Sequence, residues 1–212
     1  MKTTLHELTG QPVFIVGVQP WEWFLAVSKT GWSRILIKLD KMVRRALERS
    51  KTGKVTVVGH SAGGVISRLY LSPQPFQKRA YHGLDYVDQI ITLGSPHYNK
   101  KGAFLRRWVE EKYPGAYFSP EVKYFSIAGK SLFGNPHGSP EVRVRYSIYK
   151  YLTGDGKEWG DGVVPLASAL LNGSMMIILE RVKHYSFTDE DWYGKSGVVK
   201  KWWQELKNSR MS

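Results

Sequence analysis

One serine lies between glycines in the segment Val57-Val-Gly-His-Ser-Ala-Gly-Gly64. The segment has the pattern G-x-S-x-G, directly after an apolar run and directly before a helical pattern, which is the context that gives this pattern meaning. Glycines at 59 and 63 would allow a tight turn between strand and helix. That turn would hold the Ser61 hydroxyl exposed at the carboxyl end of a sheet, with the backbone N–H of Ala62 available to a developing oxyanion. The segment therefore predicts a nucleophilic serine.

A serine hydroxyl is a poor nucleophile unless a nearby base takes its proton, and the chain has six histidines that could do so. His184 follows the last predicted strand, the position that the base occupies in hydrolases with the chain order serine, acid, histidine. We therefore expect His184 to be the base. The other histidines lie in the polar N-terminus, inside the serine turn or in loops of earlier elements: His6, His60, His82, His97 and His137. We expect the His60 side chain to point away from Ser61.

The third group must be a carboxylate that orients the imidazole and stabilises its charged form. Asp161 is the preferred candidate, because it stands between two glycines just before the apolar segment Val163-Val-Pro165. Asp155, in Gly154-Asp-Gly156, is the nearest rival, and Glu158 is a weaker one. Gly-Asp-Gly is also a common turn sequence, so the alternatives stay open at this point.

The elements that must position these residues alternate between strand-like and helix-like segments. Continuous apolar runs predict buried strands at Pro12–Val18, Val55–Val58, Tyr86–Leu93, Val122–Ala128 and Met175–Leu179. Helices are predicted over Ser33–Ser50, with Ser33 as the N-cap, over Ala62–Leu71 and over Gly197–Asn208. Strands separated by helices indicate a parallel α/β sheet. The length predicts one domain over residues 1–212, with a small excursion or cap at 129–160.

Composition and charge exclude several classes of protein. The 212 residues are 42% hydrophobic and 23% charged, which is ordinary for a globular domain. The absence of cysteine excludes a disulfide, a thiol nucleophile and a Cys-ligated metal. The net charge of +13 would suit an anionic membrane surface, but no zinc-finger, RNP or basic-zipper pattern accompanies it, so nucleic acid is not an expected partner. No run approaches the roughly 18 apolar residues of a membrane span, and we expect a protein that is cytoplasmic or peripheral to a membrane.

Four segments together resemble α/β-hydrolases of the lipase and GPI inositol-deacylase-like branch. They are Gly59-His-Ser-Ala-Gly-Gly64, Ile90-Ile-Thr-Leu-Gly-Ser-Pro-His97, Gly160-Asp-Gly-Val-Val-Pro165 and His184; segments like Trp21-Glu-Trp23, Tyr113-Pro-Gly-Ala116 and Trp192-Tyr-Gly194 also occur in small lipase-like members. The resemblance implies an α/β-hydrolase fold and a serine carboxylic-ester hydrolase that acts through an acyl-enzyme. It implies Ser61 as nucleophile, Asp161 as acid and His184 as base, with a small-molecule or lipid ester as substrate and no metal or organic cofactor. By the same analogy His97 is structural or lines the pocket.

One βα unit of the family pattern is missing before the serine. Only the predicted strand Pro12–Val18 and the predicted helix Ser33–Ser50 precede Val55. Either Val16-Gly-Val18 is the oxyanion loop and the next strand is deleted, or it is that next strand and the oxyanion strand is absent. The segment Trp21-Glu-Trp23 resembles the stretch of chain after the later strand and favours the second interpretation.

The missing unit affects the oxyanion hole and the edge of the sheet. Ala62 would supply one N–H donor, and if Pro12–Val18 lies beside the serine strand, Val18 is the best candidate for the other. We expect weak activity limited to activated esters, and a sheet edge that favours formation of a homo-oligomer.

Two other function classes stay open. The missing unit suits a catalytically impaired, hydrolase-like binding or scaffold protein. The charge and the aromatic residues suit a peripheral lipid-surface protein. In an esterase, the aromatic residues that could line an acyl pocket are Trp21, Trp23, Trp32, Phe104, Trp108, Tyr117 and Phe118.

Overall fold

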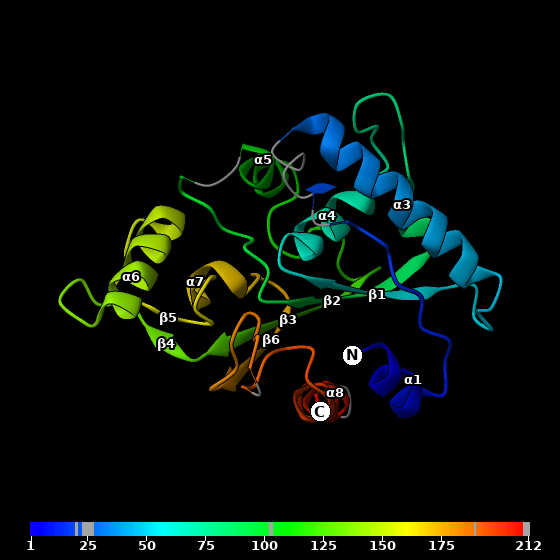
Figure 1. Cartoon of the computed structure of the whole chain (residues 1–212). Coiled ribbons are helices and arrows are strands. Elements are labelled where there is room, and N and C mark those ends of the chain that lie inside the picture. The colour runs from blue at the N-terminus through cyan, green and yellow to red at the C-terminus, as the bar shows by residue number, and fades with distance from the viewer. Residues whose placement is uncertain (20, 23–27, 102–103, 189, 210–212) are drawn as a thin grey trace.

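A parallel four-stranded sheet forms the centre of the protein (Figure 1). The computed structural model describes the chain except for residues 20, 23–27, 102–103, 189 and 210–212. The strands lie in the order β1-β2-β3-β6. Because every neighbouring pair is parallel, all four carboxyl ends lie on the same side of the sheet. Their bounds are β1 (Val55–His60), β2 (Val87–Leu93), β3 (Lys123–Lys130) and β6 (Met175–Glu180).

Helices cover both faces of this sheet (Figure 1). One face carries α3 (Lys29–Leu47), α4 (Ala62–Tyr70) and α5 (Phe104–Lys112), and the other carries α1 (Lys2–Thr9) and α8 (Ser196–Asn208). The short helix η1 (Gly83–Asp85) leads into β2. None of the helices in the described part of the chain is both long enough and apolar enough to span a membrane.

A smaller group of elements lies beside the carboxyl ends of the strands (Figure 1). It consists of the antiparallel pair β4 (Leu132–Phe133) and β5 (Trp159–Gly160) with α6 (Pro140–Thr153) and α7 (Leu166–Ala169). Helix α6 packs against β4, and α7 contacts β3. This group therefore stands where parallel α/β sheets carry their ligand sites.

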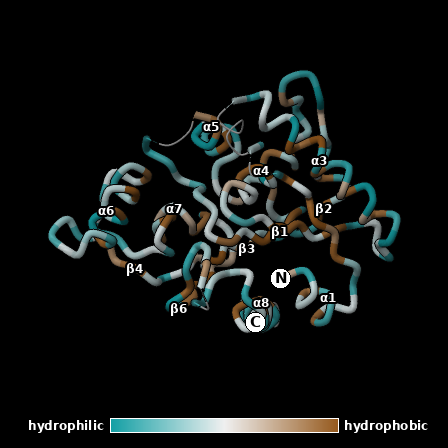
Figure 2. The backbone as a smooth tube through the Cα atoms, viewed as in Figure 1, coloured by the Kyte–Doolittle hydropathy of each residue, from teal (hydrophilic) through white to brown (hydrophobic). Residues whose placement is uncertain are grey.

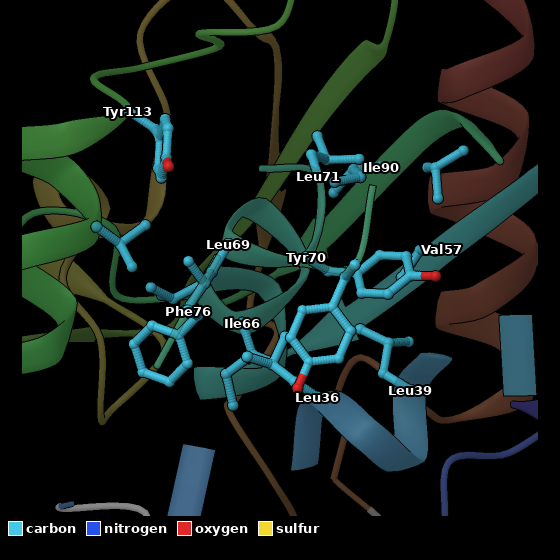
Figure 3. Close-up of a cluster of buried hydrophobic side chains, with 14 of the residues drawn as sticks. Leu36, Leu39, Val57, Ile66, Leu69, Tyr70, Leu71, Phe76, Ile90 and Tyr113 are labelled. Atoms are coloured by element: carbon cyan, nitrogen blue, oxygen red, sulfur yellow. The ribbon is translucent and has the colours of Figure 1, made fainter. Parts of the chain in front are cut away.

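Neighbouring residues of β2 enter two separate cores. Ile90 packs into the core under α3 and α4, and Ile91 packs into the core under α1 and α8, so both side chains are fully buried. Figure 3 shows the first core, in which Val57 and Ile90 of the sheet face helix residues such as Leu36 and Ile66. Burial on both faces explains the continuous apolar run of this strand, and Figure 2 shows the hydrophobic strands between more hydrophilic helices.

The α/β sheet and its order of elements confirm the predicted fold class. Strands β1, β2, β3 and β6 match the predicted strands from Val55–Val58 onward, with ends that differ by one or two residues. Helix α3 begins at Lys29 and not at Ser33, because Ser28 is its N-cap and accepts a hydrogen bond from the Gly31 N–H at 3.1 Å. Helices α1, α5 and α6 were not predicted, and α6 (Pro140–Thr153) lies within the segment predicted only as an excursion or cap.

The strand predicted at Pro12–Val18 is wrong. Residues 12–19 contain no strand, and none of the backbone hydrogen bonds of the described residues joins them to β1. The chain here passes from α1 on one face to α3 on the other: Val13 packs against the α1–α8 core, whereas Val16 and Val18 pack against the α3–α4 core. In the described residues no strand precedes β1, so the sheet lacks more than the one predicted βα unit.

Candidate active site

Ser61 stands in a strained turn between β1 and α4. Its backbone has φ 54° and ψ −131°, a left-handed conformation that costs free energy in a residue with a side chain. Two hydrogen bonds hold the turn: the Ser61 N–H donates to the Leu93 carbonyl at 3.0 Å, and the Gly64 N–H donates to the Ser61 carbonyl at 3.1 Å. We call this turn, residues 59–64, the elbow.

Close packing requires glycine at two positions of the elbow, Gly59, as predicted, and Gly64. A Cβ on Gly59 would lie 2.6 Å from the backbone of Gly64, and a Cβ on Gly64 would lie 2.1 Å from Ser95 Oγ. A Cβ on Gly63 would meet no atom within 4 Å. The predicted need for glycine at 63 is therefore wrong, and the constraint falls on Gly64.

Asp161 is a buried carboxylate directly after β5, and four donors surround it. Its Oδ1 accepts the N–H groups of Val163 and Val164 at 2.9 and 2.7 Å. Its Oδ2 accepts from His184 Nδ1 at 2.8 Å and from the Tyr193 hydroxyl at 2.9 Å. Only 2% of Asp161 is exposed. These four hydrogen bonds hold both carboxylate oxygens in one orientation.

His184 lies in the loop after β6, as sequence analysis placed it. Its backbone N–H donates to the Asp161 carbonyl at 2.9 Å, and its ring Nδ1 contacts Asp161 Oδ2. Because an ionised carboxylate can only accept, Nδ1 carries the hydrogen in a neutral ring, and Nε2 is left as the basic nitrogen. This pair of contacts fixes both the tautomer and the orientation of the ring.

His60 connects His184 to the elbow. Its Nε2 is 3.0 Å from the His184 carbonyl oxygen, and the two imidazole rings lie 4.6 Å apart between centroids. Burial, and then the neighbouring His184, lower the pKa of His60 to about 4, so the ring is neutral at pH 7. The residue directly before Ser61 thus packs against the candidate base. Ser61 Oγ itself has no hydrogen-bond partner among the described residues.

Tyr193 is a site residue that sequence analysis did not assign. Its hydroxyl donates to Asp161 Oδ2 and accepts the Gly129 N–H at 2.6 Å, so it ties the carboxylate to the end of β3. Burial, followed by the charge of Asp161, raises the pKa of Tyr193 well above its ordinary value, which keeps the phenol protonated. The segment Trp192-Tyr-Gly194 was available as a signal, but nothing in it indicated which residue the tyrosine contacts.

The rival acids and the remaining buried histidine have other partners. Asp155 is exposed, and its Oδ1 accepts the Lys157 N–H at 2.9 Å. Glu158 Oε1 accepts from the Thr153 hydroxyl at 2.7 Å. His97 is fully buried away from the pocket, and burial lowers its pKa well below the ordinary value, which fits a structural role.

The two predicted oxyanion donors, Ala62 and Val18, differ in whether their N–H is engaged in a hydrogen bond. Ala62 begins α4, so its N–H is among those that a helix leaves without an intrahelical acceptor. The Val18 N–H donates to the Val16 carbonyl at 3.0 Å, and the next N–H, of Gln19, donates to Glu22 Oε2 at 2.7 Å. The assignment of Val18 is therefore wrong: its segment is not a strand, and its donor is engaged within its own turn.

A pocket of about 360 Å³ opens at Ser61. Its other lining residues come from the loop after β2, from α5, from α6 and from the segment after Asp161: Pro96, Arg106, Ser147, Ile148, Tyr151, Leu152, Val163 and Val164. None of the expected aromatic residues that lie in the described part of the chain is among these lining residues. Trp32 and Phe118 are buried in the α3–α4 core, and Trp108 packs against that core. The exposed residues are Trp21, Phe104 and Tyr117, and Trp23 lies outside the described residues.

Comparison with known proteins agrees with this architecture. A family model, the PGAP1-like alpha/beta domain, matches residues 34–109, which run from α3 to α5. No curated protein sequence matches the chain.

Two solved structures are similar in their backbone. One is the lipase BlEst2 of Bacillus licheniformis in its mature form, with a TM-score of 0.55 and 18% identity over 80% of this chain and 71% of the lipase. The other is a candidate cell surface hydrolase of Lactobacillus plantarum WCFS1, with a TM-score of 0.36 and 19% identity over 58% of this chain and 48% of that protein, too low a score to support an argument. The first match is a likeness of fold. The chain therefore has an α/β-hydrolase fold, as the resemblance of its sequence segments implied.

Proposed function

We propose that this protein is a serine carboxylic-ester hydrolase of the lipase or esterase type. The observation that carries the proposal is the buried Asp161–His184 pair, with 2.8 Å between Nδ1 and Oδ2. The pair lies beyond the carboxyl ends of the same sheet whose first strand leads into the strained Ser61. Nucleophile, acid and base would then follow one another in the chain order of α/β-hydrolases.

In this mechanism Ser61 Oγ attacks the ester carbonyl carbon while His184 Nε2 takes the hydroxyl proton. Asp161 keeps the ring in the Nδ1–H tautomer and stabilises the imidazolium that forms. The tetrahedral intermediate collapses, the bond to the alcohol oxygen breaks, and His184 returns the proton to the departing alcohol. Water then attacks the acyl-enzyme with His184 again as base, which releases the acid and restores Ser61.

The substrate side of the proposal rests on the pocket at Ser61. Most of its lining is apolar and includes Pro96, Val163 and Val164. A pocket of this kind suits the carbon chain of a small-molecule or lipid ester.

The oxyanion hole limits the expected rate. Among the residues that the structure describes, Ala62 offers one N–H donor, whereas the N–H groups of Val18 and Gln19 already donate to Val16 and Glu22. Loss of one of two donors costs about 3–4 kcal/mol in the transition state, or roughly 10²–10³ in rate. We expect activated esters to be the best test substrates. The same observation favours the alternative of a catalytically impaired, hydrolase-like binding or scaffold protein.

Labelling with a fluorophosphonate separates the two alternatives, because it requires an activated serine and not a particular substrate. We expect the wild-type protein to be labelled and to hydrolyse 4-nitrophenyl acetate. Ser61→Ala should abolish both, with a loss of about 10⁴–10⁶ in rate, whereas Ser33→Ala, on α3, should change neither. A folded wild-type protein that is neither labelled nor active would support the impaired alternative and refute the enzyme.

A lipid surface is the second partner that we propose. Phe187 is 94% exposed, and its ring lies 5.3 Å from that of Tyr185, the residue directly after His184. With a net charge of +13, exposed aromatic rings next to the site suit an anionic bilayer. Binding to anionic vesicles that falls with added salt and weakens in Phe187→Ser would support this partner. Equal binding to neutral vesicles, or no effect of Phe187→Ser, would contradict it.

A further inference from the structure

The pocket at Ser61 contains one cationic side chain without a counter-charge. Arg106, on α5, lines the pocket and is half-buried. No ion pair or hydrogen bond to Arg106 is present among the described residues. Its partner one helical turn later would be Glu110, the spacing at which opposite charges pair on a helix. Glu110, however, binds Arg68 at 2.7 Å, so it does not neutralise Arg106.

The surroundings of Arg106 contain little that could replace water around a guanidinium. No carboxylate is among the described residues that line the pocket, and its polar side chains besides Arg106 are the hydroxyls of Ser61, Ser147 and Tyr151. Burial lowers the pKa of Arg106 from its ordinary value, while the neighbouring Tyr151 acts in the opposite direction. A guanidinium still remains charged, and removing it from water without a paired anion costs free energy.

We infer that the ester hydrolysed at Ser61 carries an anionic group that binds Arg106. This inference rests on the proposed esterase function and names its substrate class: an ester with a carboxylate or phosphate at a distance from the scissile bond. The apolar walls formed by Ile148, Leu152 and Val164 would hold the carbon chain between the two ends. The planar fork of the guanidinium matches two oxygens of either anion and would provide bidentate binding.

The test compares esters that differ only in charge. Mono-4-nitrophenyl adipate has the same acyl length as 4-nitrophenyl hexanoate but ends in a carboxylate. We expect Arg106→Gln to lower kcat/KM for the adipate ester by about 10–100-fold, the range for a lost charge-assisted hydrogen bond, and to change hexanoate by less than about threefold. Arg106→Lys should retain part of the preference. Arg107→Gln is the matched control, because its exposed side chain is next in sequence on α5 and does not line the pocket.

A second pair of esters locates the anion. Here the butyryl ester of 4-hydroxybenzoate is compared with the butyryl ester of methyl 4-hydroxybenzoate, so the charge lies on the alcohol side. An effect of Arg106→Gln on one pair of esters identifies the side of the substrate that reaches Arg106. Equal effects on charged and neutral esters in both pairs, or no effect on either, would overturn the inference.

A binding measurement tests the anion site at Arg106 independently of whether the protein is an esterase. Titration of Ser61→Ala with adipate, followed by NMR or calorimetry, requires no catalysis. We expect adipate to bind Ser61→Ala about 10–100-fold more tightly than the double variant that also carries Arg106→Gln. Equal binding would refute the anion site. The wild-type protein could show neither hydrolysis nor fluorophosphonate labelling while adipate binding still depends on Arg106. That result would refute the esterase function and support the anion site.

Discussion

Gly63 and Gly64 are adjacent in the elbow, yet alanine at the two positions should have opposite consequences. A Cβ at Gly64 would lie 2.1 Å from Ser95 Oγ, 2.8 Å from Ser95 Cβ and 2.9 Å from Thr92 Cγ2. Neither neighbour can retreat easily, because Ser95 is 0% and Thr92 1% exposed, and Ser95 Oγ also donates to the Gly59 carbonyl. Overpacking of this kind costs about 1–3 kcal/mol. The backbone shift would also move Ser61, whose carbonyl accepts the Gly64 N–H.

Alanine at position 63 should stabilise the protein, in contrast to alanine at position 64. A Cβ there meets no atom within 4 Å, and its backbone φ is not in the left-handed region. Alanine in place of glycine within a helix stabilises by about 1 kcal/mol. The two variants should therefore differ by about 2–4 kcal/mol, which for a domain of this length corresponds to roughly 4–16 °C in Tm.

Differential scanning calorimetry of Gly63→Ala, Gly64→Ala and the wild-type protein measures this difference directly. The rate of fluorophosphonate labelling reports whether the elbow keeps its geometry. We expect Gly63→Ala to raise Tm by a few degrees and to keep the labelling rate, and Gly64→Ala to lower both. A lower Tm for Gly63→Ala than for Gly64→Ala would refute the packing argument, and equal Tm values would show that the elbow relaxes at no cost.

Five further substitutions test the base His184, the two candidate acids, the Tyr193 hydroxyl and His60 of the elbow. His184→Ala should abolish esterase activity, and Asp161→Asn should lower kcat less, by about 10⁴, whereas Asp155→Asn should leave kcat unchanged; a larger effect at Asp155 would show that the wrong turn was assigned as acid. Tyr193→Phe removes a hydrogen bond to Asp161 and leaves the Gly129 N–H unpaired, so urea unfolding should show a loss of about 2–4 kcal/mol, with kcat reduced less than in Asp161→Asn. The pKa of His60 is about 4 in the folded protein and 6.5 without its surroundings, so the unfolded chain binds a proton first as pH falls. Stability should therefore fall between pH 6.5 and 4, by up to about 3 kcal/mol from His60, and His60→Gln should flatten that dependence in urea unfolding at several pH values.

The sequence predicted those parts of the fold in which a local pattern has one structural solution. The run Ile90-Ile91 is apolar on both faces because each neighbour enters a different core, and such a run has few alternatives to a buried strand. The elbow was predictable because strand, glycines and helix occur together around Ser61. The order of Ser61, Asp161 and His184 indicated the contact between the last two, and their catalytic roles remain predictions.

The features that were missed depend on contacts between distant parts of the chain. Tyr193 reaches Asp161 from 32 residues away, and nothing near either residue indicates the pairing. The choice between Gly63 and Gly64 depends on Ser95, which belongs to the loop after the next strand. Arg106 has no ion-pair partner among the described residues, because Glu110, four residues later on α5, is bound by Arg68 of α4. Patterns within one segment carry no information about such pairings.

The strand prediction for Pro12–Val18 was wrong for a geometric reason that the hydrophobicity of the segment does not show. Helix α1 buries Leu5 in the core on one face of the sheet, and α3 covers the other face. Two layers that sandwich a sheet lie roughly 20 Å apart, at about 10 Å for each packed layer. Residues 12–19 can extend over at most about 28 Å, so most of their length is needed to pass the edge of β1. A segment that crosses the edge cannot also run along it, and for this reason the Val18 N–H turns to Val16 and does not extend the sheet beside Ser61.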